Sequence, residues 1–112
     1  LEDAARRISP RTRAIIVVHY GGRMVEPGAL EAFAREHGLL VIEDCAHAAG
    51  ARHDGRPAGS IGDLGCFSFH AVKNLPVGDG GMITTDSRET YRALKKLRET
   101  LPAQNLYPIL EP

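Results

Sequence analysis

The sequence lacks the features that would tie the chain to a membrane or a nucleic acid. No apolar run approaches the ~20 residues that span a bilayer, and the first residues lack the apolar segment of a signal peptide. The 14 basic and 14 acidic side chains leave no formal net charge, which argues against nucleic acid and anionic membranes as partners. The glycine-rich stretch 78–81 matches neither the phosphate-loop pattern nor the dinucleotide-binding fingerprint.

The chain is also poor in cysteine and has no initiator methionine. Cys45 and Cys66 both lie in apolar segments, which favours free thiols in a reducing cytoplasm. Together with His47 and His70 they offer possible metal ligands, but no pair has the usual zinc spacing, so we predict no metal site. Because the chain opens inside a helical pattern, we expect it to be a piece of a longer protein.

Alternating strand and helix patterns predict an α/β fold. Continuous apolar runs at 14–18 and 39–42 are typical of strands covered on both faces of a sheet. The remaining patterns predict the end of a helix at 1–8, a helix from Glu26-Pro27 to Gly38, a short helix or turn at 46–50, a loop or hairpin at 50–63, strands at 64–69 and 81–85, and a helix capped by Asp86 or Ser87.

The connection between the last two strands fixes their relative direction. About eleven residues without a helical pattern separate them, whereas a parallel crossover needs a dozen or more and usually a helix. We therefore predict a three-layer α/β architecture whose mostly parallel sheet carries one antiparallel strand. Residues 102–112, which contain prolines and show no period, are predicted to form an irregular tail.

Lys73 follows the carboxyl end of a predicted strand and precedes the glycine-rich stretch. Ligands of open α/β sheets bind outside the carboxyl ends of the strands. A desolvated amine at that position can lose its proton near neutral pH and attack a carbonyl to form a Schiff base. A lysine taken alone is better interpreted as a solvated surface residue. The case for a reactive amine therefore depends on the residues around Lys73.

Three further residues sit at the ends of the central strands. Asp44 either caps a short helix or pairs with a cationic ligand atom, such as the pyridinium nitrogen of pyridoxal phosphate. His47 would share a face with it on a helical turn, although a lone histidine is more often structural. The hydroxyl of Ser68 would bind a phosphate or satisfy a neighbouring carbonyl. An acid and an amine at one rim are two of the groups that pyridoxal phosphate requires.

The order of these motifs resembles the DegT/DnrJ/StrS group of sugar-nucleotide aminotransferases. The resemblance covers about residues 8 to 101, and its motifs are Pro10 to Gly21, Val41 to Gly50, Phe67 to Asn74 and Gly80 to Thr85. That family consists of pyridoxal-phosphate enzymes with the aspartate aminotransferase fold (type I). The resemblance implies that residues 1–101 form the central part of the large, cofactor-binding domain.

The resemblance also implies roles for individual residues. Lys73 would form the internal aldimine and then move the proton during transamination, and Asp44 would keep the pyridinium nitrogen protonated. His47 falls where the family has Gln or His beside the ring, and Ser68 would bind the phosphate. Some relatives have His in place of the lysine and act as dehydratases, so Lys73 favours transamination of a keto-sugar nucleotide. Glutamate or glutamine would donate the amino group, and a homodimer would complete the site.

Members of this family are much longer, and the parts that precede and follow this segment supply further cofactor and substrate contacts. We therefore expect the isolated chain to be a poor enzyme or none. Two alternatives remain open. The chain is a non-catalytic or regulatory truncated relative that binds pyridoxal phosphate at most, or it is a doubly wound nucleotide-binding module with a solvated Lys73.

Overall fold

The structure is a computed structural model that describes residues 1–100. The predicted tail 102–112 and the domain boundary at 101 lie outside the described residues. The elements are α1 (Glu2–Ala5), β1 (Ala14–Val18), the 3₁₀ helix η1 (Tyr20–Gly22), α2 (Pro27–His37), β2 (Leu40–Asp44), β3 (Arg52–His53), β4 (Arg56–Pro57), β5 (Leu64–Ser68), β6 (Gly81–Thr84) and α3 (Arg88–Thr100). None of the described helices is long and apolar enough to cross a bilayer.

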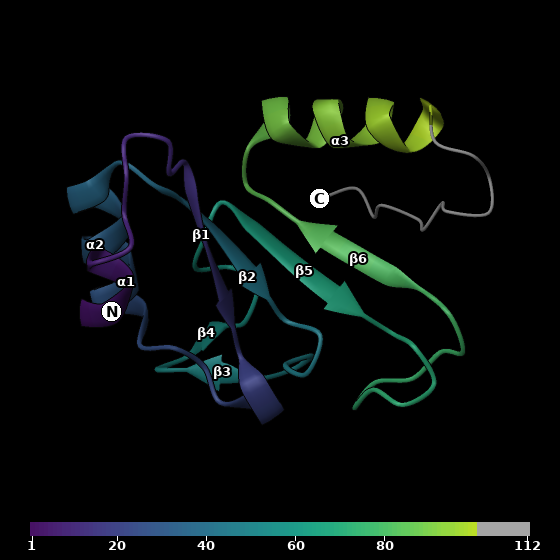
Figure 1. Cartoon of the computed structure of the whole chain (residues 1–112). Helices are drawn as coiled ribbons and strands as arrows, with labels where there is room; N and C mark the ends of the chain where they lie inside the picture. Colours follow the sequence, from purple (N-terminus) through teal and green to yellow (C-terminus); the bar gives the residue numbers. More distant parts are fainter. Residues whose placement is uncertain (101–112) are drawn as a thin grey trace.

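Four of the strands form one mixed sheet in the order β1-β2-β5-β6 (Figure 1). β1, β2 and β5 are parallel, whereas β6 runs antiparallel to β5. This confirms the predicted mostly parallel α/β sheet with one antiparallel strand. The short connection forces that direction, because the chain reaches the edge of β5 without a crossover helix.

The sequence signals for turns and helix ends are also confirmed. Asp54 and Gly55 both have positive φ values, 48° and 82°, and join β3 to β4 in a small hairpin. Gly38 ends α2 in the left-handed conformation, with φ of 62°. The hydroxyl of Ser87 accepts a hydrogen bond from Thr90 N–H at 3.1 Å and so caps α3. Residues 46–50 form turns rather than a helix.

One face of the sheet carries the main hydrophobic core. α2 lies against this face because its apolar residues recur at helical spacing, and Leu30 and Phe33 point inward. They pack with Val17 of β1 and Val41 of β2, and Leu30 is completely buried. Burying side chains of this size contributes roughly 1.5–3 kcal/mol each, so α2 and the two strands stabilise one another.

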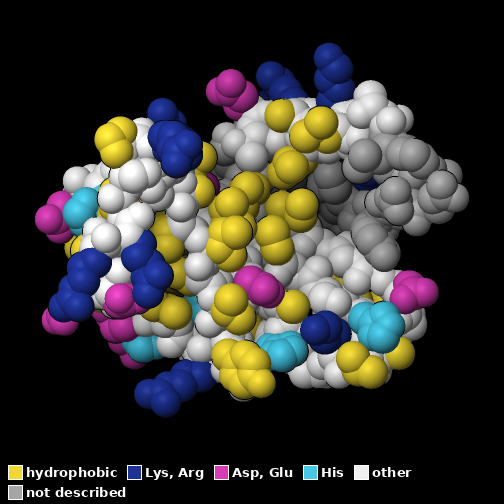
Figure 2. Space-filling view, in the orientation of Figure 1, with side chains coloured by type: hydrophobic (Ala, Val, Ile, Leu, Met, Phe, Trp, Pro, Cys, Tyr) yellow, Lys and Arg dark blue, Asp and Glu magenta, His cyan; other side chains and the backbone are white. Residues whose placement is uncertain are grey.

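The opposite face of the sheet is open over β1 and β2. Ile16, Val18 and Leu40 are 66%, 51% and 56% exposed. Figure 2 shows hydrophobic side chains gathered over β2 and β5 and continuing toward α3. No residue of α3 is buried. The prediction that both apolar strands are covered on both faces is therefore wrong for residues 1–100, where each is covered on one face.

Candidate active site

The carboxyl ends of β1, β2 and β5 meet at one edge of the sheet (Figure 1). All four residues that the sequence singles out lie at this edge. Asp44 and Ser68 are the last residues of β2 and β5. His47 lies in the turn that follows β2, and Lys73 lies in the loop that follows β5. The parallel arrangement thus gathers groups that are up to 29 positions apart, from 44 to 73, in the sequence.

Asp44 and Ser68 also share a face of the sheet. Asp44 pairs directly with Cys66 across the two strands, and Ser68 stands two residues farther along β5. Side chains alternate between the faces of a sheet, so all three lie on the open face, with the Cα atoms of Asp44 and Ser68 about 8 Å apart by ideal strand geometry. A carboxylate and a hydroxyl therefore stand on the side of the sheet that no described helix covers at this point.

The Asp44 carboxylate is only partly used by the protein. Its Oδ1 accepts a hydrogen bond from Ala46 N–H at 3.0 Å. This bond closes a turn, so the capping role considered from the sequence is present, although it caps a turn and not a helix. The other oxygen, Oδ2, has no hydrogen-bond partner among the described residues. One carboxylate oxygen therefore remains available to a ligand.

Lys73 lies in a pocket at the same edge. The pocket measures about 520 Å³ and is lined by Phe67, Ser68, His70, Val72, Lys73, Asp79, Gly80 and Gly81. Lys73 is partly buried, whereas every other residue of 70–79 is exposed. The Lys73 amine forms no ion pair within residues 1–100. Ser68 and Lys73 are thus brought together in one cavity.

The loop that carries Lys73 extends the β5–β6 hairpin. Phe69 N–H donates to Gly80 O at 2.8 Å, and Val77 N–H donates to Phe69 O at 3.0 Å. Lys73 N–H donates to His70 O at 2.9 Å and forms a tight turn. The glycine-rich stretch therefore forms the return limb of this hairpin and lines the pocket with backbone.

The side chain of Asn74 links this hairpin to the neighbouring turn. Its Nδ2 donates a hydrogen bond to Ala49 O at 2.8 Å, across a separation of 25 residues. Ala49 lies in the segment that follows Asp44, so this bond joins the loop after β5 to the loop after β2. The sequence contains Asn74 within a motif, but its acceptor is a backbone carbonyl, which leaves no signal in the sequence.

Ser68 and His47 keep groups that a ligand can use. Among residues 1–100, the oxygen of Ser68 accepts only a long contact from His70 N–H, at 3.5 Å, so its hydroxyl proton remains available. His47 is exposed, and its ring lies edge-on to Tyr20 with ring centroids 5.4 Å apart. The loop after β1 thereby contacts the loop after β2, and both line the carboxyl edge.

The sequence does not predict the hydrogen-bond network of Glu43. Glu43 is fully buried on the covered face of β2. Its Oε2 accepts hydrogen bonds from His19 Nε2 and Gly59 N–H at 2.8 and 2.9 Å, and its Oε1 accepts from Ile61 N–H and Gly62 N–H, both at 2.8 Å. Four donors at these distances match the capacity of an ionised carboxylate.

His19, which donates a hydrogen bond to Glu43, is neutral in this arrangement. His19 Nδ1 accepts a hydrogen bond from Val25 N–H at 3.2 Å, so the ring proton is assigned to Nε2, which donates to Glu43. Burial by itself raises the pKa of Glu43. The hydrogen bonds from Gly62, His19, Gly59 and Ile61 outweigh burial, and the net effect is a lowered pKa. Glu43 is a structural anion that binds residues 59–62 to β1 and β2.

His19, Glu43 and Cys45 could be mistaken for a metal centre, because their ligand atoms lie within 4.8 Å of one another. Both ring nitrogens of His19 and both oxygens of Glu43 already have hydrogen-bond partners. Burial, with smaller contributions from neighbouring groups, raises the pKa of the Cys45 thiol to about 12. A thiol must lose its proton to bind a metal, so this cluster is saturated by the protein itself.

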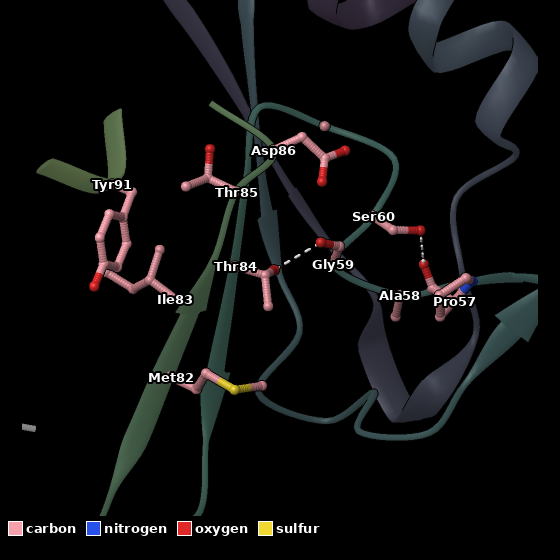
Figure 3. A pocket seen from close by; sticks show the side chains of 11 residues that line it. Pro57, Ala58, Gly59, Ser60, Met82, Ile83, Thr84, Thr85, Asp86 and Tyr91 are labelled. Carbon is pink, nitrogen blue, oxygen red and sulfur yellow. Dashed lines mark hydrogen bonds between the residues drawn. The ribbon is translucent and has the colours of Figure 1, made fainter. Parts of the chain in front are cut away.

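A second pocket lies at the opposite end of the parallel strands, between residues 57–62 and β6 (Figure 3). It measures about 390 Å³. Two of its polar side chains bind the chain itself: Thr84 Oγ1 donates to Gly59 O at 2.6 Å, and Ser60 Oγ donates to Pro57 O at 2.8 Å. No lysine or histidine lines it. This pocket offers no group that the sequence predicts for catalysis.

The chain is similar in sequence to known aminotransferases. The sequence model of the DegT/DnrJ/EryC1/StrS aminotransferase family matches residues 1–103. The chain is 52% identical over 92 residues to UDP-N-acetyl-3-dehydro-alpha-D-glucosamine 3-aminotransferase of Acidithiobacillus ferrooxidans, covering 81% of this chain and 25% of that protein. It is 49% identical over 92 residues to dTDP-3-amino-3,4,6-trideoxy-alpha-D-glucose transaminase of Micromonospora megalomicea, covering 81% and 25%.

A solved structure agrees with the sequence matches. The structure of DesI in the presence of its TDP-sugar product superposes with a TM-score of 0.84 at 38% identity. The superposition covers 96% of this chain and 28% of DesI. The chain therefore spans about a quarter of the length of the curated relatives that it matches.

Proposed function

Because this chain belongs to the DegT/DnrJ/EryC1/StrS aminotransferase family, we propose that it is the lysine-bearing part of a pyridoxal-phosphate-dependent aminotransferase of keto-sugar nucleotides. The observation that carries the proposal is the placement of Asp44, Ser68 and Lys73 at one edge of the sheet. Asp44 has an unpaired carboxylate oxygen there, and Ser68 and Lys73 share one pocket.

The side chains present fit the chemistry of that cofactor. The carboxylate of Asp44 would hold a proton on the pyridine nitrogen, and the hydroxyl of Ser68 would donate to the phosphate. His47 would lie beside the ring. The Lys73 amine would hold the cofactor aldehyde and afterwards take up and return the proton that moves during transamination. When bound, pyridoxal phosphate supplies an electron sink for the carbon that loses or gains the amino group.

The names of two relatives support the proposed substrate class. The two aminotransferases compared above are named for a UDP-linked and a dTDP-linked sugar, so the proposed acceptor is a keto-sugar nucleotide. The proposed donor is glutamate or glutamine, as the resemblance implies. The equal numbers of basic and acidic side chains, 14 of each, give no reason to propose a nucleic-acid partner. The two free thiols, Cys45 and Cys66, accord with a cytoplasmic location, which stays a prediction.

A homodimer is part of the proposal. Val72, Leu75 and Val77 are exposed in the loop that carries Lys73, and they are 81%, 52% and 66% accessible. Three large apolar side chains beside the proposed cofactor site accord with a second subunit that closes the site. Sedimentation analysis of the complete protein tests this, and a monomer at micromolar concentration would contradict it.

The decisive experiment locates the cofactor on the chain. Pyridoxal phosphate is added, borohydride fixes it to the lysine that holds it, and peptide mapping identifies that residue. We expect the label at Lys73 and its loss in Lys73→Ala, whereas the matched control Lys96→Ala, in exposed α3, keeps it. Labelling at another lysine, or equal labelling of Lys73→Ala, would overturn the assignment and favour a nucleotide-binding module with a solvated Lys73.

The alternative function is that of a non-catalytic or regulatory relative that binds pyridoxal phosphate without turnover. Both interpretations predict labelling of Lys73, and they differ in an assay with a keto-sugar nucleotide and glutamate or glutamine. We expect the 112-residue chain to show little or no turnover. Full turnover would show that the prediction of an incomplete site is wrong.

A further inference from the structure

The loop of residues 69–80 holds its own shape but has few connections to its surroundings. Its backbone hydrogen bonds connect Phe69 with Gly80, Val77 with Phe69, and Lys73 with His70, and each of them stays within the loop. Val72 N–H donates to His70 Nδ1 at 3.5 Å, which is again internal. Apart from Lys73, residues 70–79 are exposed, so packing restrains them little.

One hydrogen bond connects residues 70–79 to another part of the molecule. Within residues 1–100, the bond from Asn74 Nδ2 to Ala49 O at 2.8 Å is the only one from this loop that leaves the β5–β6 hairpin. The position of the loop tip relative to β2 therefore depends on Asn74.

The acceptor belongs to a segment that is itself firmly closed. Ala48 N–H donates to Cys45 O at 2.9 Å, and Ala51 N–H donates to Ala48 O at 3.0 Å. The Asp44 carboxylate binds Ala46 N–H in the same segment. Ala49 lies within the second of these turns, residues 48–51, and its carbonyl oxygen is a fixed point for the Asn74 side chain.

We propose that Asn74 is a positioning residue that sets the placement of the Lys73 amine relative to the Asp44 carboxylate. Asn74 directly follows Lys73, so a shift of its backbone moves the lysine as well. The proposal rests on the proposed function, in which both groups hold one ring. Two groups that must contact one rigid ligand bind it more tightly when their separation is fixed before binding.

The test compares two variants with a control that loses an equivalent hydrogen bond elsewhere. Asn74→Asp keeps the shape of the side chain but places an oxygen against the Ala49 carbonyl, and Asn74→Ala removes the donor altogether. Ser60→Ala removes an exposed side chain that donates a hydrogen bond to a backbone oxygen, Pro57 O at 2.8 Å, outside the loop. The dissociation constant for pyridoxal phosphate and the share of borohydride-fixed label on Lys73 against Lys95 and Lys96 are measured for each chain. Hydrogen exchange and the melting temperature are measured without the cofactor.

We expect pyridoxal phosphate to bind about fivefold more weakly to both Asn74 variants, which is the usual worth of one hydrogen bond. The label should spread from Lys73 to the lysines of α3. The exchange of the Lys73 and Val77 amides should stay as in the parent chain, because their bonds are internal to the loop. The melting temperature should fall by no more than the few degrees that one hydrogen bond is worth. Ser60→Ala should match the parent in pyridoxal phosphate affinity and in labelling.

The outcomes separate this proposal from the proposed function. Parent-like affinity and labelling in both Asn74 variants would overturn the positioning role and leave Lys73 as the cofactor lysine. Weaker binding together with faster exchange at Lys73 and Val77 would also overturn it, because Asn74 would then keep the loop folded and not place it. Absence of label on Lys73 in the parent chain would overturn the proposed function, and the positioning role with it.

Discussion

Glu43 and Asp44 are adjacent carboxylates on one strand, yet they face opposite sides of the sheet. Glu43 points into the covered side, is fully buried and accepts four hydrogen bonds. Asp44 points to the open side, is half-buried and accepts one. The alternation of side chains along a strand is enough to give two neighbouring acids these different surroundings.

The two faces of the sheet differ in the same way as these two acids. On the covered face, α2 and the Glu43 network hold the strands together. On the open face, the polar groups at the carboxyl edge keep capacity for a ligand, and apolar side chains remain accessible. We therefore expect substitutions on the covered face to cost stability, and substitutions at the open edge to cost ligand binding.

The largest expected effect concerns the two acids themselves. Glu43→Gln places an amide against backbone N–H groups and removes a buried charge from its partners, which should cost about 3–5 kcal/mol of unfolding free energy. Asp44→Asn keeps an oxygen for Ala46 N–H and should cost below about 1 kcal/mol. Urea unfolding followed by circular dichroism measures both. Equal losses for the two variants would contradict the division between the faces.

A smaller effect is expected from a pair of leucines. Leu30 of α2 is fully buried in the core, whereas Leu40 of β2 is more than half exposed on the open face. Leu30→Ala should cost about 2–5 kcal/mol, because it removes buried apolar atoms and leaves a cavity. Leu40→Ala should cost below about 1 kcal/mol in the 112-residue chain. If Leu40→Ala proved as costly as Leu30→Ala, the open face would have to be covered in solution.

The elements with strong local signals could be predicted from the sequence. The apolar runs predict β1 and β2, the short connection predicts the antiparallel direction of β6, and the order of strands places Asp44 and Lys73 at one edge. An apolar run indicates that a strand avoids water, but it does not say which segment covers each face. For that reason the exposure of Ile16 and Leu40 could not be predicted.

The two networks that the sequence did not predict share a physical reason. Glu43 binds the backbone N–H groups of Gly59, Ile61 and Gly62, and Asn74 binds the backbone carbonyl of Ala49. Every residue has a backbone carbonyl and every residue except proline a backbone N–H, so these groups leave no mark in the residue types. Only the tertiary fold brings them next to these side chains, across separations of 16 to 25 residues.

The next expected effect is a dependence of the unfolding free energy on pH. Hydrogen bonds lower the pKa of Glu43 against the opposing effect of burial. The unfolded chain therefore binds the proton more readily than the folded one. The stability from Glu43 is present above the pKa of the unfolded state and is lost as pH falls through the pKa of the folded state.

Urea midpoints measured from pH 7 down to pH 3 test this expectation. Glu26 also has a lowered pKa, because the N–H groups of Ala29 and Gly28 bind its exposed carboxylate. Glu26→Gln serves as the control. As pH falls, its urea midpoint should still decrease by most of the amount seen for the parent chain. Glu43→Gln should show a flatter dependence on pH. A parent chain whose midpoint does not change over this range would contradict the role assigned to Glu43.

The smallest effect is a difference in chemical reactivity that leaves stability unchanged. Cys45 packs against Ala48 and Ala58 on the covered side, and burial raises the pKa of its thiol to about 12. Cys66 lies opposite Asp44 on the open face; burial and the charge of Asp44 raise its pKa as well, but its side chain remains partly accessible. Since the thiolate is the reacting species and must be reached by the reagent, iodoacetamide at pH 8 should modify Cys66 at least about tenfold faster than Cys45. In urea the two rates should become equal, and faster modification of Cys45 in the folded chain would show that the covered face opens more readily than the exposed one.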